Sequence, residues 1–298
     1  MQQGFEQLGL IGCGLIGGSF ALALKRAGCV RRVAGYSPSL STIERARQLG
    51  VIDTAAASAQ QAVAGADLVL VAAPVAATEA IFKTIGEAIA PNALVMDVGS
   101  TKSDVIAAAR AALPADKLPY FVPAHPIAGK EVAGVSHAEA RLFENRQVVL
   151  TPIEPTLQAH VQRATQVWES TGAKVIIMAP DAHDNALAAV SHLPHLLAYA
   201  FIAGIAGQAQ GARFLDLGGP GFRDFSRIAA SAPTIWRDIL LANRAAVLAQ
   251  SATFRGALDR FEALLRAGDA QALEEAIAAA SRTRAQWQPE VMVPPPKV

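Results

Sequence analysis

The chain has 298 residues, of which 52% are hydrophobic and 17% charged, and its formal net charge is +1. This composition is typical of a well-buried soluble protein long enough for two domains, and it excludes a disordered chain. No block of like charges is present, so the sequence offers nothing that would attract nucleic acid or a membrane surface.

Cysteine content and the first residues of the chain bear on its compartment. The two cysteines, Cys13 and Cys29, are too few for a disulfide framework and lack the spacing of metal ligands. Residues 1–7 contain no basic segment followed by an apolar core, so we expect no export signal. We therefore expect a protein of the reducing cytoplasm that holds no metal.

A glycine-rich turn follows the first predicted strand, residues 7–11, and opens a helix rich in alanine and leucine. This G-x-G-x-x-G pattern in a strand–turn–helix context predicts a dinucleotide site, against the alternative of a turn without a ligand. Gly12 permits the tight turn, Gly14 lets the backbone approach the phosphates, and Gly17 lets the helix pack on the strand. The candidate cofactor-binding residues of this loop are Gly12, Gly14, Leu15, Ile16 and Gly17.

Short apolar runs recur along the first half of the chain, with helix-periodic segments between several of them. We predict strands at residues 7–11, 32–36, 68–72, 94–97, 121–123 and 147–150. Such alternation builds a Rossmann-type doubly wound parallel sheet, whose ligands lie beyond the carboxyl ends of the strands. Ala73 and Pro74 follow the third of these runs and are therefore candidate cofactor contacts.

The end of the second strand bears on the choice of cofactor. An NAD-binding fold usually places Asp or Glu there, but this chain has Tyr36 and Ser37 and no carboxylate. The hydroxyls of Ser37, Ser39 and Thr42 are candidate contacts for a 2′-phosphate, which favours NADP over NAD. Turn and N-cap chemistry explains the same residues, and no arginine directly follows Ser37 to pair with a phosphate.

Two loops after later strands carry candidate catalytic groups. Ser100 lies between the strand at 94–97 and a helix, where Ser100 or Ser103 could equally cap that helix. His125 follows the strand at 121–123, so its imidazole should lie at the carboxyl edge of the sheet, where a nicotinamide would bind. It is a candidate general base, and a structural histidine is the alternative.

The character of the sequence changes near residues 151–155, where two prolines precede helical sequence. We place the boundary between a dinucleotide-binding domain, residues 1–152, and a helical substrate and dimerisation domain, residues 153–298. The second domain carries one more apolar run, at 174–178, and helical patterns over 181–207, 225–248 and 257–284. Its apolar surface predicts a homodimer. The run 196–207 is shorter than the roughly 20 residues of a membrane span, so we interpret it as a buried helix.

Polar residues interrupt the apolar helices of the second domain. His192 and His195 lie three residues apart beside Pro194. Burying two imidazoles and a proline in an apolar helix costs free energy unless the imidazoles are hydrogen-bonded or take part in the function. Arg223 and Arg227 lie one helical turn apart, where they could fork onto a carboxylate or pair along a solvated face. The remaining histidines, predicted to be surface or capping residues, are His137, His160 and His183.

Together these motifs resemble, in order and across nearly the whole chain, the prephenate/arogenate dehydrogenase family of tyrosine biosynthesis. The resemblance rests on the glycine loop, residues 99–102, 125–129 and 191–195, and residues 222–227 followed by Trp236. It implies NAD(P)-dependent oxidative decarboxylation of prephenate, arogenate or both. The roles that it implies are proton acceptor for His125, orientation of the hydroxyl for Ser100, substrate contact for His192, carboxylate binding for Arg227, pocket closure for Glu131 and Trp236, and a contribution from the partner subunit for Asp224.

Two departures from the family pattern concern the turn and the cofactor. Pro220 stands in a turn that is usually all glycine, and Ser37 leaves the choice of cofactor open. We expect no regulatory domain after Arg284, although tyrosine could still inhibit at the active site. The alternatives are another two-domain reductase or hydroxyacid dehydrogenase and a non-catalytic nucleotide-sensing dimer. A β-hydroxyacid enzyme would need a lysine between residues 181 and 207, where the chain has none.

Overall fold

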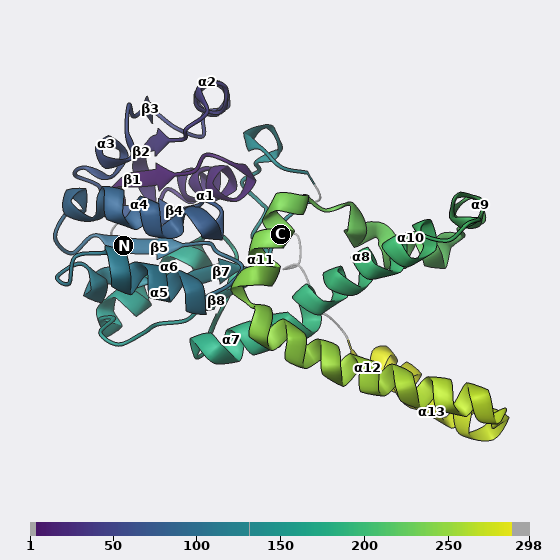
Figure 1. The fold of residues 1–298 in the computed structure, drawn as a ribbon. Coiled ribbons are helices and arrows are strands. Elements are labelled where there is room, and N and C mark those ends of the chain that lie inside the picture. Colours follow the sequence, from purple (N-terminus) through teal and green to yellow (C-terminus); the bar gives the residue numbers. More distant parts are fainter. Residues whose placement is uncertain (1–3, 131, 288–298) are drawn as a thin grey trace, which may run out of the picture. The chain divides into compact units, whose positions relative to one another are not determined.

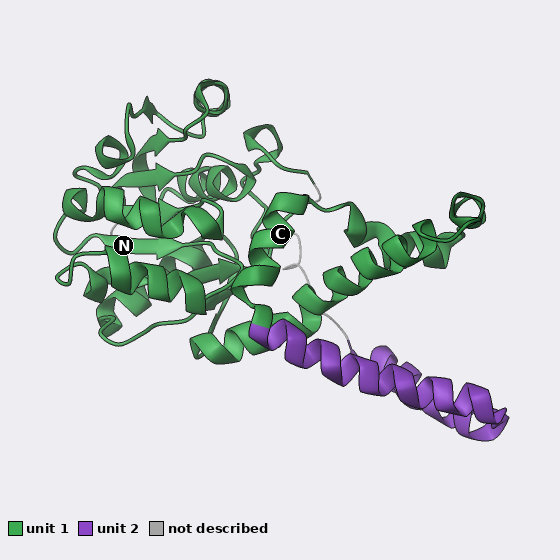
Figure 2. Cartoon of the chain, viewed as in Figure 1, with its two compact units in different colours: residues 1–244 green, residues 245–298 purple. Residues whose placement is uncertain are grey.

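The structure is a computed structural model that describes residues 4–130 and 132–287. Contacts within the chain divide it into two compact units, residues 1–244 and 245–298 (Figure 2). The first unit holds both sheets and the glycine loop. The described part of the second unit, residues 245–287, is mainly helical and includes α13 (Ala270–Gln286).

A parallel six-stranded sheet with strand order β3-β2-β1-β4-β5-β6 forms the centre of the first unit (Figure 1). Its strands are β1 (Phe5–Ile11), β2 (Val30–Tyr36), β3 (Thr54–Ala55), β4 (Leu68–Val71), β5 (Leu94–Asp97) and β6 (Phe121–Val122). The accompanying helices are α1 (Leu15–Arg26), α2 (Leu40–Gln48), α3 (Ala59–Val63), α4 (Thr78–Ile85), α5 (Ser103–Ala112) and α6 (Gln158–Ser170). The predicted Rossmann-type sheet is confirmed. Strand order reverses between β1 and β4, which places a ligand crevice at their carboxyl ends.

Both faces of this sheet are buried at its centre, which is why β4 and most of β5 appear in the sequence as continuous apolar runs. In β4, Leu68 and Leu70 belong to one hydrophobic cluster, and Val69 and Val71 belong to the other. Successive side chains of a strand point to opposite faces, so each face receives every second residue. The fully buried Trp168 of α6 belongs to the cluster that contains Leu68.

A second sheet of three strands corrects two of the strand predictions. Its strands are β7 (Ala124–Pro126), β8 (Gln147–Leu150) and β9 (Lys174–Ile177), with β7 antiparallel and β9 parallel to β8. The strand predicted at 121–123 ends at Val122, because Pro123 has no N–H for the ladder, and the chain enters β7 directly. Residues 147–150 form a strand as predicted, but in this smaller sheet.

The chain after β9 is helical, as predicted, but more finely divided. Its helices are α7 (Pro180–Leu187), α8 (Leu193–Ala206), α9 (Gly211–Leu215), α10 (Pro220–Ser226), α11 (Pro233–Ala242), α12 (Arg244–Ala267) and α13 (Ala270–Gln286). A π-helical turn, Ala188–His192, joins α7 to α8, and a 3₁₀ turn, Arg227–Ala230, follows α10. The continuous helix predicted over 225–248 is wrong, because the chain breaks before Pro233, which opens α11, and again at Asn243.

The apolar helix after β9 is longer and less buried than expected. Pro180–Ala206 is one helical run of 27 residues, long and apolar enough by length and composition alone to cross a membrane. Only 22% of its most apolar window is buried in the chain. The interpretation of residues 196–207 as a buried helix is therefore wrong for a single copy, because no other element of the described chain covers most of it.

The predicted domain boundary between residues 152 and 153 stays a prediction. The smaller sheet pairs strands from both sides of that position, since β8 ends at Leu150 and β9 begins at Lys174. The compact units divide much later, after Arg244.

Candidate active site

The glycine loop has the geometry that its sequence predicts. Gly12 has φ +94°, and a Cβ there would lie 2.1 Å from the carbonyl oxygen of Ala72. A Cβ on Gly17 would lie 2.2 Å from the carbonyl oxygen of Gly12, whereas one on Gly14 would meet nothing within 4 Å. Gly14 is also the N-cap of α1, with no side-chain cap. The loop therefore closes tightly at two glycines and leaves open space in front of a helix N-terminus, which suits a pyrophosphate.

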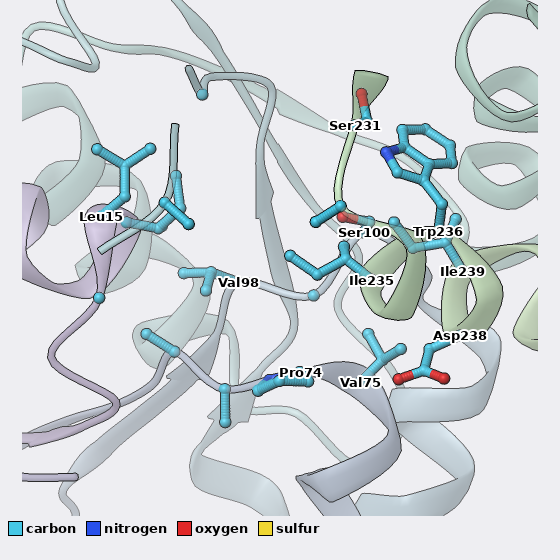
Figure 3. Close-up of a pocket in the computed structure, with 18 of the residues that line it drawn as sticks. Leu15, Pro74, Val75, Val98, Ser100, Ser231, Ile235, Trp236, Asp238 and Ile239 are labelled. Atoms are coloured by element: carbon cyan, nitrogen blue, oxygen red, sulfur yellow. The ribbon is translucent and has the colours of Figure 1, made fainter. Parts of the chain in front are cut away.

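A pocket of about 480 Å³ lies at this loop (Figure 3). It is lined by residues that follow β1, β4 and β5, by residues 128–130 and 132–134, and by the start and one face of α11. The lining includes Gly14, Leu15, Ile16, Ala73, Pro74, Ser100, Gly129, Lys130, Ser231, Trp236 and Asp238. In Figure 3, Leu15 lies on one side, and Ser100, Ile235 and Trp236 lie on the other. Five predicted cofactor contacts thus share a pocket with Ser100 and Trp236.

The predicted contacts at the end of β2 lie outside the residues that line this pocket. Ser39 is the N-cap of α2, and its hydroxyl accepts a hydrogen bond from the backbone N–H of Thr42 at 3.3 Å. The Ser37 hydroxyl accepts from the N–H of Ser39 at 3.5 Å. Capping therefore accounts for Ser39, while the absence of a carboxylate at the end of β2 still leaves room for a 2′-phosphate.

A buried ion pair fixes the loop between β5 and α5. Lys102 is fully buried and pairs with Asp97, and its Nζ also donates to the carbonyl oxygen of Ala124 at 2.7 Å. The other carboxylate oxygen of Asp97 accepts from the N–H of Ala124 at 3.0 Å. These bonds tie the end of β5, next to Ser100, to the start of β7, next to His125. Sequence reasoning missed this role of Asp97 and Lys102.

No side chain of the loop itself caps the N-terminus of α5, so neither Ser100 nor Ser103 is its capping residue. The carboxylate of Asp184, from α7, accepts from the N–H groups of Lys102 and Ser103, each at 2.8 Å. Burial alone would raise the pKa of Asp184, but hydrogen bonds from His183, from the Ser103 hydroxyl and from these amides lower the pKa to about 2. Asp184 is therefore a carboxylate at neutral pH.

His125 lies in β7 and is buried. Its Nδ1 lies 2.8 Å from Nε2 of His183, and Nδ1 of His183 lies 2.8 Å from Oδ1 of Asp184. Burial is the main cause that lowers the pKa of His125 well below its usual value, and the charge of Lys102 adds to it. His125 is therefore neutral at physiological pH and available to accept a proton.

The prediction that His160 and His183 are surface or capping residues is wrong. His183 is fully buried and His160 is 5% exposed. His160 stacks on Tyr120, away from the pocket. His183 was missed because its burial depends on a contact with the distant N-terminus of α5. The one signal in the sequence is an imidazole directly beside a carboxylate, His183 and Asp184, just before an apolar helix.

The other two candidate histidines adjoin the pocket through Trp236. His192 is buried at the end of the π-helical turn, and its Nδ1 lies 3.1 Å from Nδ2 of Asn243. Burial lowers the pKa of His192 to about 4. The ring of His195 stacks on Trp236 with 3.4 Å between centroids, and its Nδ1 lies 2.9 Å from the carbonyl oxygen of Ser191. Asn243 was missed by sequence reasoning.

The remaining candidates are separate from this cluster or lie outside the described chain. Glu131 lies outside the described residues. Asp224, on α10, and Arg227, at the start of the following 3₁₀ turn, are exposed and do not line the pocket of the single chain. Pro220 occupies the first turn of α10 after Gly219, a position that proline favours. Among the described residues, no group of three or more His, Cys, Asp and Glu side chains is placed to hold a metal.

Comparison with known proteins identifies the family. Residues 20–177 match the model for the nucleotide-binding domain of prephenate dehydrogenase, and residues 179–279 match the model for its dimerization domain. The chain belongs to the prephenate dehydrogenase family. It is thus an oxidoreductase that uses a nicotinamide dinucleotide, and the resemblance stated from the sequence is confirmed.

Individual members of this family are similar over most of the chain. Cyclohexadienyl dehydrogenase of Zymomonas mobilis is 36% identical, covering 82% of this chain and 83% of its own. Prephenate dehydrogenase of Bacillus subtilis is 35% identical, covering 92% of this chain and 74% of its own. The crystal structure of A. aeolicus prephenate dehydrogenase with hydroxyphenyl propionate and NAD+ superposes with a TM-score of 0.90 at 31% identity, covering 96% of this chain and 99% of that one.

Proposed function

We propose that this protein catalyses the NAD(P)-dependent oxidative decarboxylation of prephenate, arogenate or both, yielding 4-hydroxyphenylpyruvate or tyrosine in tyrosine biosynthesis. One observation carries the proposal: the buried imidazole of His125 adjoins Ala124, which is tied by Asp97 and Lys102 to the loop that brings Ser100 to the pocket. The glycine loop lines the same pocket. The imidazole that we propose as proton acceptor is thus linked to a loop that lines the same pocket as the glycine loop.

The chemistry follows from these positions. A bound nicotinamide would supply the acceptor for a hydride. The hydroxyl-bearing ring carbon of the substrate loses that hydride, the ring carboxylate leaves as CO2, and the ring becomes a phenol. His125 accepts the hydrogen bond or the proton of the ring hydroxyl, and Ser100 orients both that hydroxyl and His125. Aromatisation makes the step effectively irreversible.

The substrate contacts that we propose are His192, His195, Arg227, Asp224, Glu131 and Trp236. The stacking of His195 on Trp236, which lines the pocket, supports the assignment of these two residues. Arg227 would bind a substrate carboxylate in a charge-assisted fork. Asp224 and the turn at 219–221 would come from the partner subunit, which agrees with their exposure in the single chain.

For the cofactor we propose a preference for NADP over NAD. The residues from Tyr36 to Ser39 carry no carboxylate to repel a 2′-phosphate or to hold a ribose 2′-hydroxyl. Gly12, Gly14, Gly17, Leu15 and Ile16 would hold the pyrophosphate side of either cofactor. Ser37, Ser39 and Thr42 would meet the 2′-phosphate.

We also propose that the protein is a cytoplasmic homodimer without nucleic-acid or membrane partners, in which residues 1–152 bind the cofactor and residues 153–298 bind substrate and dimerise. The match to a dimerization domain supports the dimer. The free thiols of Cys13 and Cys29 support a reducing compartment.

The deciding experiment measures initial rates of reduced nicotinamide formation by the purified protein. Prephenate and arogenate are each crossed with NAD and NADP in parallel assays. Turnover with either substrate supports the reaction, and a larger kcat/KM with NADP supports the cofactor preference. If no combination turns over while fluorescence shows that the reduced cofactor binds, the proposed reaction is wrong and a nucleotide-binding dimer without this activity replaces it.

A further inference from the structure

A series of buried hydrogen bonds connects the N-terminus of α5 to His125. The carboxylate of Asp184 accepts from the amides of Lys102 and Ser103, and its Oδ1 also meets Nδ1 of His183 at 2.8 Å. Nε2 of His183 then meets Nδ1 of His125 at 2.8 Å. The proton positions in this series follow from its first member, because a carboxylate can only accept hydrogen bonds.

Since Asp184 accepts, His183 carries its proton on Nδ1, and a neutral imidazole then has a lone pair on Nε2. That lone pair can bond to Nδ1 of His125 only if His125 carries its own proton on Nδ1. Nε2 of His125 is then left as the unprotonated nitrogen. This is the tautomer in which His125 can accept a proton at Nε2.

A second branch starts at the same residue and ends in the opposite tautomer. Nδ2 of Asn243 donates to the backbone carbonyl oxygen of Asp184 at 2.7 Å, which identifies that atom as the amide nitrogen. Its other proton points to Nδ1 of His192, at 3.1 Å. Nδ1 of His192 therefore accepts, and its proton lies on Nε2.

We propose that Asp184 sets both tautomers, through His183 for His125 and through Asn243 for His192, so that His125 accepts a proton and His192 donates a hydrogen bond. Asp184, His183 and Asn243 are positioning residues, because they act through the two imidazoles. This inference rests on the proposed function only in taking His125 as the proton acceptor of the reaction.

The same series stabilises the charge that forms during proton transfer. When Nε2 of His125 takes a proton, its Nδ1–H remains bonded to His183, and the negative charge of Asp184 lies next in the series. Lys102, His183 and His192 are the other titratable groups that face His125, and each disfavours its protonation. Asp184 is the group that opposes them.

Nitrogen NMR of the ligand-free protein labelled with 15N-histidine tests the tautomers without any turnover. We expect the Nδ1–H form for His125 and His183 and the Nε2–H form for His192 at about pH 7. Replacement of each histidine in turn assigns the signals of the six imidazoles. An Nε2–H signal for His125, or an Nδ1–H signal for His192, overturns the inference even if the enzyme is active, and the expected pattern stands even if the proposed substrates are wrong.

Kinetics of His183 variants test the consequence for the reaction. His183→Phe keeps the ring and removes the acceptor, so we expect kcat to fall by about 100-fold or more, with the cofactor Kd unchanged. His183→Gln restores an N–H towards Asp184 and an oxygen towards His125, so it should recover at least about tenfold of that loss. His160→Phe, the same change at a buried histidine away from the pocket, is the control and should leave kcat unchanged. If Gln is as poor as Phe, His183 is merely structural and the inference fails.

Discussion

The three glycines of the loop, Gly12, Gly14 and Gly17, are needed for different physical reasons. At Gly17 the space for a Cβ is taken by the carbonyl oxygen of Gly12, 2.2 Å away, and at Gly12 by that of Ala72. At Gly14 the space is open and faces the pocket. Packing thus requires glycine at two positions, and the ligand that we propose requires it at the third.

This difference predicts opposite results for two alanine substitutions. Gly17→Ala should destabilise the fold, because α1 must move off β1 to admit the methyl group. Gly14→Ala should keep the thermal unfolding temperature and lose cofactor affinity, because its methyl group occupies the space of the phosphates. Thermal unfolding and cofactor titration by fluorescence measure the two effects. A Gly14→Ala protein that binds cofactor as tightly as the wild type would show that the pyrophosphate lies elsewhere.

The lowered pKa values of the histidines predict acid sensitivity. The pKa of His192 falls from 6.5 to about 4 on folding, mainly through burial, so the unfolded chain binds a proton between these pH values and the folded chain does not. The free energy of unfolding therefore drops as the pH falls through this window, by up to about 3 kcal/mol, and is unaffected above it. His125 acts in the same direction. Asp184 contributes only below its ordinary pKa of 3.8, where its own stabilisation is lost.

Urea unfolding between about pH 7 and about pH 4 measures this loss. His192→Gln removes one of the titrating groups, so its stability should depend less steeply on pH than that of the wild type. The variant His137→Gln, at an exposed position, is the control and should keep the wild-type slope. Equal slopes for the wild type and His192→Gln would mean that His192 titrates normally in the folded protein.

At the scale of elements, the sequence predicted most of the parallel sheet because its strands are buried on both faces. β4 is apolar throughout, and residues 8–11 of β1 and 94–96 of β5 are continuous apolar runs. β3 was missed because its two residues are exposed and carry no apolar signal. The smaller sheet was missed because an apolar run indicates a strand but not the strand with which it pairs. The pairing of β7 with β8 depends on the tertiary structure.

The candidate site was predictable only in part, for the same reason. Ser100, Leu15 and Trp236 follow recognisable motifs, and the structure brings them to one pocket. His183 and Asn243 have no motif, and their importance arises from contacts with residues 51 or more positions away along the chain. Sequence patterns indicate local structure, whereas these contacts form only when distant segments of the chain come together.

We expect the π-helical turn Ala188–His192 to be the element most sensitive to a change in its number of residues. Such turns hold one extra residue in a helix, and here the turn ends at His192. Deleting the exposed Val190 should convert the wide turn to α-helix, so that His192 loses the position beside Asn243 that the turn gives it. We expect kcat to fall by about 100-fold or more with helix content retained, as measured by assay and circular dichroism. Val190→Ala, which preserves the residue count, should behave as the wild type, and an active deletion variant would contradict the role of the turn.

At the scale of the whole molecule, we expect the exposed apolar surface of the region from α8 to α10 to be buried against another protein surface. Phe201, Phe214, Leu217 and Phe225 are each at least 41% exposed in the single chain. Apolar surface of this kind marks an interface in a soluble protein. Together with the match to a dimerization domain, it favours a second copy of the chain as the cover.

Charge placed on this surface should therefore separate the subunits. The double variant Leu217→Glu, Phe225→Glu should change the mass in light scattering from twice 31.0 kDa to a single chain, because each interface would bury four carboxylates without partners. Leu40→Glu, at an equally exposed leucine on α2, should remain a dimer. If Asp224 and the turn at 219–221 complete the neighbouring pocket, the monomer should still bind cofactor while its KM for substrate rises. A monomer with wild-type KM would show that each subunit holds a complete site, and a wild-type protein that is already monomeric would leave the apolar surface to another partner.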